Sequence, residues 1–393
     1  MHAVSRPRQV HPFPARMAPE LALAALDRVA SDAIVLDPMC GSGTVLRHAR
    51  EQGKTAFGYD IDPLAVLIAR VTCTRVCASR LRRAAERLVD AAQRTPAPRL
   101  PWLDEDSGTR AFVDFWFDGV QQTQLRALAA ALHGSRGKVA DALRVALSRT
   151  IITKDAGASR ARDVSHSRPH RVRTSNDYDV YRGFLTAVER IAPLLDTPGS
   201  ASVSVSRRDA RRLPPSLRGK VDLVLTSPPY LNAIDYMRGH RMSLVWLGYP
   251  TRELTRLRSE SVGAERFPDA GSSTATHAAR YRGLTARQQG MLDRYAADID
   301  TLAGQLAQVL SPRGEAVLVV GDSTLSGTYV QNSRIVRAAA ERHGLLLTDR
   351  QRRVLPTSSR YLPPPGSSAG PLSKRMREEV VMRFSRSAVG SSR

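Results

Sequence analysis

The residues best suited to chemistry are Ser227, Pro228, Pro229 and Tyr230, which follow an apolar run at 221–225. Two successive prolines fix the backbone and carry no N–H, so nearby carbonyl groups stay available as acceptors in a rigid frame. The Ser227 hydroxyl and the Pro228 carbonyl could each accept one hydrogen of an NH₂ group, which localises the nitrogen lone pair for attack on an activated methyl group. Tyr230 could stack on the base that carries this amine. A plain Pro-Pro turn is the structural alternative, and a hydrolase is disfavoured because no G-x-S-x-G motif surrounds Ser227.

A second group of residues, Asp37 to Thr44, forms a glycine-containing loop between a predicted strand and a predicted helix. Glycines let the backbone approach a ligand closely. The loop lacks the lysine of a phosphate-binding P-loop, and Leu46 stands where a dinucleotide-binding loop has its third glycine. Asp37 suits an amino-bearing or cationic ligand, and Asp60 ends the next strand, where a carboxylate can bind a ribose diol. The pattern predicts a pocket for S-adenosylmethionine; an ordinary tight turn with two surface acids is the alternative.

The loop and the tetrapeptide together resemble the superfamily of S-adenosylmethionine-dependent amino-methyltransferases, which includes the N-4/N-6 DNA methylases. Residues 11–17 are similar to the family's N-terminal segment, which packs against the methionine end of the cofactor, and 206–211 to its strand-end acid near the adenine. For Asp209, a turn carboxylate paired with arginines is the alternative. The resemblance implies a catalytic role for the tetrapeptide. It also implies cofactor contacts from Phe13, Arg16, Asp37, Pro38, Cys40, Gly41, Ser42, Gly43, Thr44, Asp60, Ile61, Asp209 and Ala210.

The motif that begins at Thr226 and ends at Tyr230 is most similar to that of cytosine-N4-specific, site-specific DNA methyltransferases. The resemblance implies DNA as the substrate and a restriction endonuclease of the same modification system as a partner. Three alternatives stay open: adenine N6 in DNA, guanine N2 in tRNA, and a non-catalytic nucleic-acid-binding protein with a vestigial cofactor pocket. No metal site is predicted, because the three cysteines supply no second Cys/His pair for zinc.

The charge of the chain independently favours a polyanionic partner. The chain carries 59 Lys and Arg against 37 Asp and Glu, a formal net charge of +22, and such a field attracts nucleic acid. Arginine greatly outnumbers lysine, which a GC-rich genome would also produce. The basic run 159–177 offers phosphate or base contacts from Arg160, Arg162, Arg168, Arg171 and Arg173. A solvated linker is the alternative for this run, and the polar stretch 251–285 is a rival contact region.

Positioning these motifs requires a parallel sheet. Apolar runs predict strands at 33–36, 55–59, 201–205, 221–225, 315–320, 345–348 and 378–384. Helical patterns occur at 19–30, 44–52, 63–78, 121–133, 144–153, 231–248, 290–309 and 333–343. We therefore predict an α/β, Rossmann-like class I methyltransferase fold: a mostly parallel seven-stranded sheet with a C-terminal antiparallel hairpin and a large basic insertion.

The expected organisation is a methyltransferase domain in two parts, 1–78 for the cofactor and 201–384 for catalysis. A basic insert at 79–200 is the predicted target-recognition region, and 385–393 is a frayed tail. With 42% hydrophobic residues, the chain can bury a core. It has no apolar stretch of about 18 residues, no signal-peptide core and too few cysteines for a disulfide framework, so we expect a cytoplasmic protein away from membranes. We expect it to act as a monomer.

Overall fold

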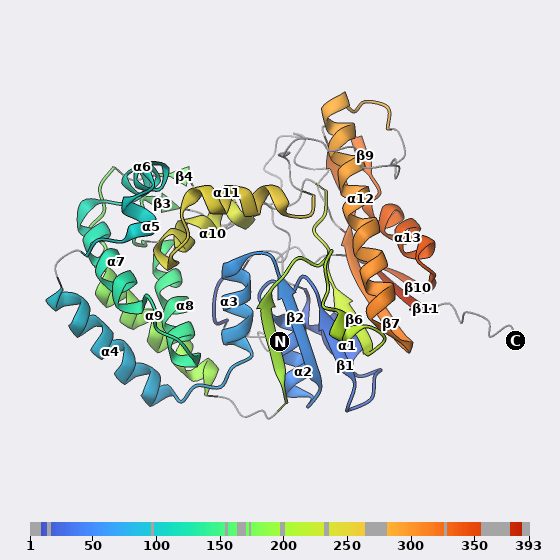
Figure 1. Cartoon of the computed structure of the whole chain (residues 1–393), viewed down its shortest axis with the longest axis horizontal. Helices are drawn as coiled ribbons and strands as arrows, with labels where there is room; N and C mark the ends of the chain where they lie inside the picture. The colour runs from blue at the N-terminus through green and yellow to red at the C-terminus, as the bar shows by residue number, and fades with distance from the viewer. Residues whose placement is uncertain are drawn as a thin grey trace, which may run out of the picture.

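The computed structural model describes residues 9–13, 17–95, 98–153, 156–162, 170–172, 174–196, 201–231, 236–263, 281–325, 328–354 and 378–386. Its centre is a seven-stranded sheet in the order β10-β11-β7-β6-β1-β2-β5 (Figure 1). The strands are β1 (Ile34–Asp37), β2 (Thr55–Asp60), β5 (Val203–Arg207), β6 (Val221–Thr226), β7 (Leu310–Gly321), β10 (Leu345–Val354) and β11 (Glu378–Arg386). β11 is antiparallel to β7 and β10, and all other neighbouring pairs are parallel. This confirms the predicted mostly parallel sheet with a C-terminal antiparallel hairpin.

Helices cover both faces of the sheet. On one face α1 (Pro19–Leu26), α2 (Thr44–Glu51) and α3 (Pro63–Thr72) share a core with Val35 and Leu223. On the other face α12 (Ala286–Val309) and α13 (Asn332–Arg342) share a core with Leu36 and Val224. Neighbouring residues of a strand point to opposite faces, so β1 and β6 each contribute to both cores. Burial on both faces explains why these strands are continuous apolar runs in the sequence.

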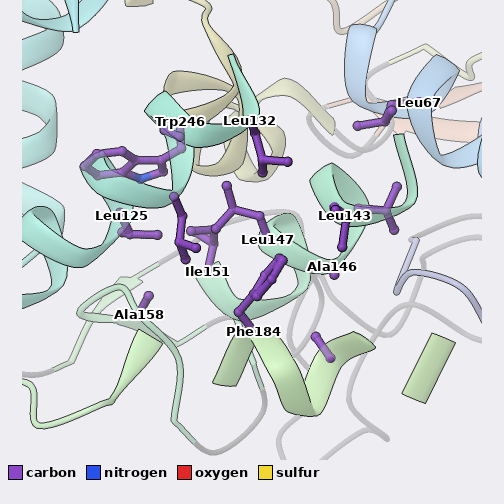
Figure 2. Packing of buried hydrophobic residues seen from close by; sticks show 14 of the residues in the cluster. Leu67, Leu125, Leu132, Leu143, Ala146, Leu147, Ile151, Ala158, Phe184 and Trp246 are labelled. Carbon is purple, nitrogen blue, oxygen red and sulfur yellow. The ribbon is translucent and has the colours of Figure 1, made fainter. Parts of the chain in front are cut away.

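The segment between β2 and β5 folds into a helical unit, residues 78–195, beside the sheet (Figure 1). It contains α4 (Ala78–Arg94), α5 (Pro101–Asp104), α6 (Ser107–Trp116), α7 (Gly119–Leu132), α8 (Lys138–Ile151), α9 (Val180–Leu195) and a short ladder of β3 (Ala161–Arg162) with β4 (His170–Arg171). Figure 2 shows Leu147, Ile151 and Phe184 in its core, together with Trp246 from beyond β6. Leu67 of α3 belongs to the same core, so the helical unit packs directly against the helix that follows β2.

The connection from β6 to β7 contains α10 (Tyr236–Leu244), η2 (Val245–Leu247) and α11 (Thr251–Glu260) before α12. The other short elements are η1 (Pro215–Leu217), β8 (Ser323–Leu325) and β9 (Thr328–Val330). In the described part of the chain, no helix is both long and apolar enough to cross a membrane.

One predicted helix, 63–78, is wrong at its end. α3 stops at Thr72 and α4 begins at Ala78, because the intervening run is rich in β-branched and cysteine residues, which have low helix propensity. Cys73 is buried at the end of α3, whereas Cys77 is exposed ahead of α4. The two cysteines therefore do not share a helix, as the single-helix prediction would require.

Candidate functional site

The strand order reverses between β1 and β6. From β1 the chain continues outward to β2 and β5, and it later returns to β6 and β7 on the other side of β1. In open α/β sheets, ligands bind outside the carboxyl ends of the strands at such a reversal point. The predicted loop follows β1 and the predicted tetrapeptide follows β6, so both lie here. The Thr226 hydroxyl donates a hydrogen bond to Asp37 Oδ1 at 2.8 Å, which ties the two strand ends together.

The loop after β1 turns toward β2 through its glycines. The Gly41 N–H donates to Asp60 Oδ2 at 2.9 Å, and the Cys40 N–H donates to the Tyr59 carbonyl at 2.8 Å. Gly41 has a φ of +48°, and a Cβ there would lie 3.1 Å from the Phe13 ring. The structure thus brings Phe13, Gly41 and Asp60 together. Phe13 and Gly41 are 28 residues apart in the sequence, and no clear pattern links them there.

Gly43 is needed for a close approach between helices. Its φ is +79°, and a Cβ would lie 2.9 Å from the Ala69 Cα of α3. A larger residue would be strained and would also push α2 away from α3. Of the remaining predicted cofactor residues, Pro38, Cys40 and Ala210 are buried and Ser42, Thr44 and Ile61 are half-buried.

Two acids at the reversal point carry raised pKa values. Burial raises the pKa of Asp37 to about 7, against the hydrogen bonds that Thr226 and Met39 donate to it. Burial and the neighbouring Asp62 raise the pKa of Asp60 to about 6. Within the described residues, neither Asp37 nor Asp60 forms an ion pair. These two buried carboxylates therefore suit a cationic ligand.

A third acid, Asp62, is paired. It caps α3 by accepting hydrogen bonds from the N–H groups of Leu64 at 2.8 Å and Ala65 at 3.4 Å. Its other oxygen lies 2.5 Å from Nδ1 of His240 on α10. Burial opposes ionisation of Asp62, but His240 and the helix N–H groups outweigh it and hold the pKa of Asp62 below its ordinary value.

The tetrapeptide is held from two sides. The Ser227 hydroxyl donates to the Val319 carbonyl of β7 at 3.0 Å and lies 3.3 Å from the Tyr230 hydroxyl. The Pro228 ring lines a small apolar pocket with Leu302 of α12 and Leu318 of β7. Because a serine hydroxyl has one proton, the bond to Val319 leaves the Ser227 oxygen able to accept. This is the arrangement that an acceptor role for Ser227 requires.

Glu379 belongs to the same network, although the sequence analysis missed it. It lies on β11, paired with Gly321 of β7, and its Oε1 accepts a hydrogen bond from the Tyr230 hydroxyl at 3.4 Å. Burial raises the pKa of Glu379, and Arg353, whose guanidinium lies 3.3 Å away, works against this rise. Glu379 thus takes the proton of the Tyr230 hydroxyl, while the Ser227 proton goes to Val319.

Asp209 follows β5, whose carboxyl end lies beside that of β2. Both of its carboxylate oxygens accept hydrogen bonds from the Arg211 guanidinium, at 2.7 to 3.1 Å. Arg211 also donates to Asp298 Oδ1 at 2.5 Å. This geometry favours the alternative reading of Asp209, a turn carboxylate paired with arginine, over the contact to adenine that the resemblance implies.

The arginines predicted to contact nucleic acid have different surroundings. Arg160 is ion-paired with Asp118 inside the helical unit, so its charge is not presented to a phosphate. Arg171 is exposed and lies over the Phe115 ring, 5.0 Å from its centroid. Arg162 is on β3, with its side chain outside the described set, and Arg16, Arg168 and Arg173 lie outside the described residues.

Asp62 and His240 are not among the predicted site residues, and only Asp62 has a clear signal in the sequence. Asp62 precedes Pro63, and Asp at the N-cap with Pro at the first helical position is a recognisable helix start. Nothing in the sequence pairs His240 with Asp62, because 178 residues separate them.

A scan against models of protein families gives no match to the chain, and a search among curated proteins gives none either. Several solved structures are similar at a low level. A SAM-dependent methyltransferase from Methanosarcina mazei is 9% identical over 95% of this chain and 99% of its own, with a TM-score of 0.36. A geranyl diphosphate methyltransferase is 9% identical over 94% of this chain and 76% of its own, with a TM-score of 0.36. An rRNA methyltransferase from Streptomyces viridochromogenes is 11% identical over 95% of this chain and 87% of its own, with a TM-score of 0.30. Because these identities and TM-scores are low, we assign the fold of this chain from its own strand order, and we assign none of these activities to it.

Proposed function

We propose that this protein transfers a methyl group from S-adenosylmethionine to an exocyclic base amine in DNA, and that the amine is N4 of cytosine. The observation that carries the proposal is the hydrogen bond from Thr226 to Asp37, which joins the tetrapeptide to the glycine loop at the reversal point. A donor bound at the loop and an amine bound at the tetrapeptide would be neighbours. In-line transfer needs this proximity, which supplies much of the rate.

The loop residues fit S-adenosylmethionine by charge and by hydrogen-bonding capacity. Asp37 and Asp60 are buried acids with raised pKa values, and the ammonium and sulfonium groups of the cofactor would supply the positive charge that they lack. Each oxygen of Asp60 accepts one N–H, from Gly41 and from Asp62. A carboxylate has about four acceptor sites, so capacity remains for the two ribose hydroxyls. Phe13 and Gly41 would flank the methionine end.

The tetrapeptide residues orient the amine. When bound, S-adenosylmethionine supplies an electrophilic methyl group. The Ser227 oxygen, whose own proton is used on Val319, accepts one amine hydrogen, and the Pro228 carbonyl accepts the other. These two bonds localise the nitrogen lone pair, which is otherwise delocalised into the ring. The Tyr230 ring stacks on the extruded base, a contact worth about 1–3 kcal/mol.

No dedicated base is required for this reaction. The methylated amine carries an extra proton, which solvent can accept after the transfer. Extruding the base from a duplex costs a few kcal/mol and is expected of enzymes that act on a base. The serine in the tetrapeptide supports cytosine as the target by its resemblance to cytosine-N4 enzymes, and the net charge of +22 supports a nucleic-acid substrate. Methylation at adenine N6, or at guanine N2 in tRNA, would use the same geometry.

Nucleoside mass spectrometry tests the proposal. The protein is incubated with methyl-labelled S-adenosylmethionine and either unmethylated DNA or unmodified tRNA, and the polymers are digested to nucleosides. We expect labelled N4-methylcytosine from the DNA. Labelled N6-methyladenine or N2-methylguanosine would keep the transfer chemistry and overturn the assignment of cytosine. Cofactor binding without a labelled nucleoside from either polymer would contradict the proposal and favour a non-catalytic nucleic-acid-binding protein.

A further inference from the structure

His240 lies beside the cofactor half of the proposed site. It is on α10, the first helix after the tetrapeptide, and it is buried, with 5% of its surface exposed. Its Nδ1 lies 2.5 Å from Asp62 Oδ2. Asp62 in turn donates its N–H to Asp60 Oδ1 at 3.0 Å, so one residue separates His240 from the proposed ribose acid.

His240 also packs on the N-terminal segment. The rings of Phe13 and His240 are 5.3 Å apart, and the same Phe13 ring covers Gly41. One turn further along α10, Ser243 accepts a hydrogen bond from Ser148 of α8 at 2.9 Å. His11 Nε2 lies 2.9 Å from the Ser148 hydroxyl, so the N-terminal segment, α8 and α10 are linked in one chain of hydrogen bonds.

We propose that His240 is a positioning residue that holds the proposed cofactor site in place, acting through its hydrogen bond to Asp62 and its contact with Phe13. This inference rests on the proposed function. The Asp62–His240 pair is buried, and removing one partner of such a pair leaves an uncompensated buried group that must move or change protonation. Movement of Asp62 would displace Asp60, which accepts its N–H, and the start of α3, which Asp62 caps.

The chain offers a matched control for a structural effect. His48 on α2 is also buried, with 7% of its surface exposed, and its Nδ1 lies 2.8 Å from Glu51 Oε2. This pair lies within α2, past the helix start that adjoins the loop. Substituting either histidine by leucine removes the same kind of hydrogen bond, but only His240 touches Asp62 and Phe13.

The test compares His240→Leu, His240→Asn and His48→Leu in the full chain. Asparagine keeps an N–H donor near the position of Nδ1, so it should restore the bond to Asp62. We expect His240→Leu to raise the Kd for S-adenosylmethionine roughly 10- to 100-fold, the range for losing a hydrogen bond to a charged group, and to lower kcat as well. His240→Asn should recover most of both values. His48→Leu should lower the melting temperature without changing either.

A double-mutant cycle with Asp62→Asn checks the coupling. Because each single substitution breaks the same bond, we expect their effects on Kd to be strongly non-additive. Additive effects, or a His240→Leu protein whose Kd and kcat match those of His48→Leu, would overturn the inference. If His240→Leu does not fold, a Kd for His240→Asn as weak as that of Asp62→Asn overturns it equally. A wild-type protein that neither binds the cofactor nor methylates would instead defeat the proposed function.

Discussion

At the scale of single residues, the direction of one hydrogen bond decides what Ser227 can do. A serine that gives its proton to a general base is poised as a nucleophile. Here the proton goes to the Val319 carbonyl, which is no base, so the oxygen is prepared to accept rather than to attack. The site therefore favours orientation of an incoming N–H donor over covalent catalysis.

Ser227→Ala tests this role. Loss of one preorganised polar group in an active site lowers kcat by roughly 10²-fold or more, and we expect that size of loss here. The Kd for S-adenosylmethionine should stay unchanged, because Ser227 is proposed to bind the amine and its hydroxyl donates to Val319 of β7. Steady-state kinetics and titration calorimetry measure the two quantities, with Ser202→Ala, at an exposed serine ahead of β5, as the control. A loss of cofactor affinity equal to the loss of turnover would contradict the assigned role.

The acids at the loop predict that cofactor binding is linked to pH. The pKa of Asp60 rises from 3.8 to about 6 on folding, and that of Asp37 to about 7. The folded state thus favours their protonated forms, a contribution to stability that is present below pH 3.8 and lost as the pH rises through about 6 and 7. A cationic ligand favours the ionised forms, so its affinity should increase over the same range, with protons released on binding.

Calorimetry in two buffers with different ionisation heats measures that release. We expect cofactor binding to release protons near pH 6.5, which is within about one pH unit of the pKa values of both acids. The release should be smaller for Asp60→Asn. A Kd that does not change between about pH 5 and pH 8, a range that spans both titrations, would show that neither acid faces the cation.

Part of the site was predictable because its residues are close in sequence. The loop from Asp37 to Thr44 and the tetrapeptide each form a local pattern, and Asp60, the proposed ribose acid, ends the next strand. Glu379 and His240 could not be found in this way, since each meets its partner across 149 or 178 residues. Their roles depend on the sheet register and on helix packing, which sequence patterns do not encode.

At the scale of elements, the central strands were predictable and the helical unit was only partly so. The strands are buried on both faces and are therefore continuous apolar runs. In α4 the buried residues are Leu81, Ala85, Val89 and Ala92, spaced about one turn apart. This amphipathic pattern was present in the sequence, but frequent arginine and alanine around it gave the region only the composition of a basic insert.

The approach of α2 to α3 gives a prediction at this scale. Gly43→Ala should destabilise the protein more than Gly53→Ala, although both glycines have a φ near +80°. Each substitution incurs the left-handed backbone cost of roughly 1–2 kcal/mol. Only at Gly43 does a Cβ also meet Ala69, at 2.9 Å, and overpacking adds typically 1–3 kcal/mol. Denaturant unfolding measures the difference, and equal losses for the two variants would contradict the close packing of these helices.

At the scale of the whole molecule, the net charge of +22 is divided between arginines that form internal ion pairs and arginines that are exposed. Several arginines are used internally, such as Arg160 with Asp118 and Arg211 with Asp298. Others, such as Arg171, remain exposed. The sequence indicated the sign of the field, whereas only the structure separates arginines that hold the fold from those that can meet a phosphate.

This separation predicts different effects for two arginines of the same run. Arg171→Ala should weaken DNA binding and reduce the slope of log K against log salt by about 1, as for one lost phosphate contact. Arg160→Ala should lower the melting temperature, because it leaves Asp118 unpaired inside the helical unit. Fluorescence anisotropy over a salt series and thermal unfolding measure the two effects. A flat salt profile for the wild-type protein would remove nucleic acid as a partner.

The central claim is that the ends of β1 and β6 bring a methyl donor and a base amine together. The most direct measurement is a single turnover with deuterated S-adenosylmethionine and unmethylated DNA, followed by mass spectrometry of the nucleosides. We predict N4-methylcytosine that carries all three deuterium atoms, formed by the wild-type protein and nearly absent with Ser227→Ala. Cofactor bound by the wild-type protein, with no deuterated methyl group on any base of DNA or tRNA, would contradict the claim.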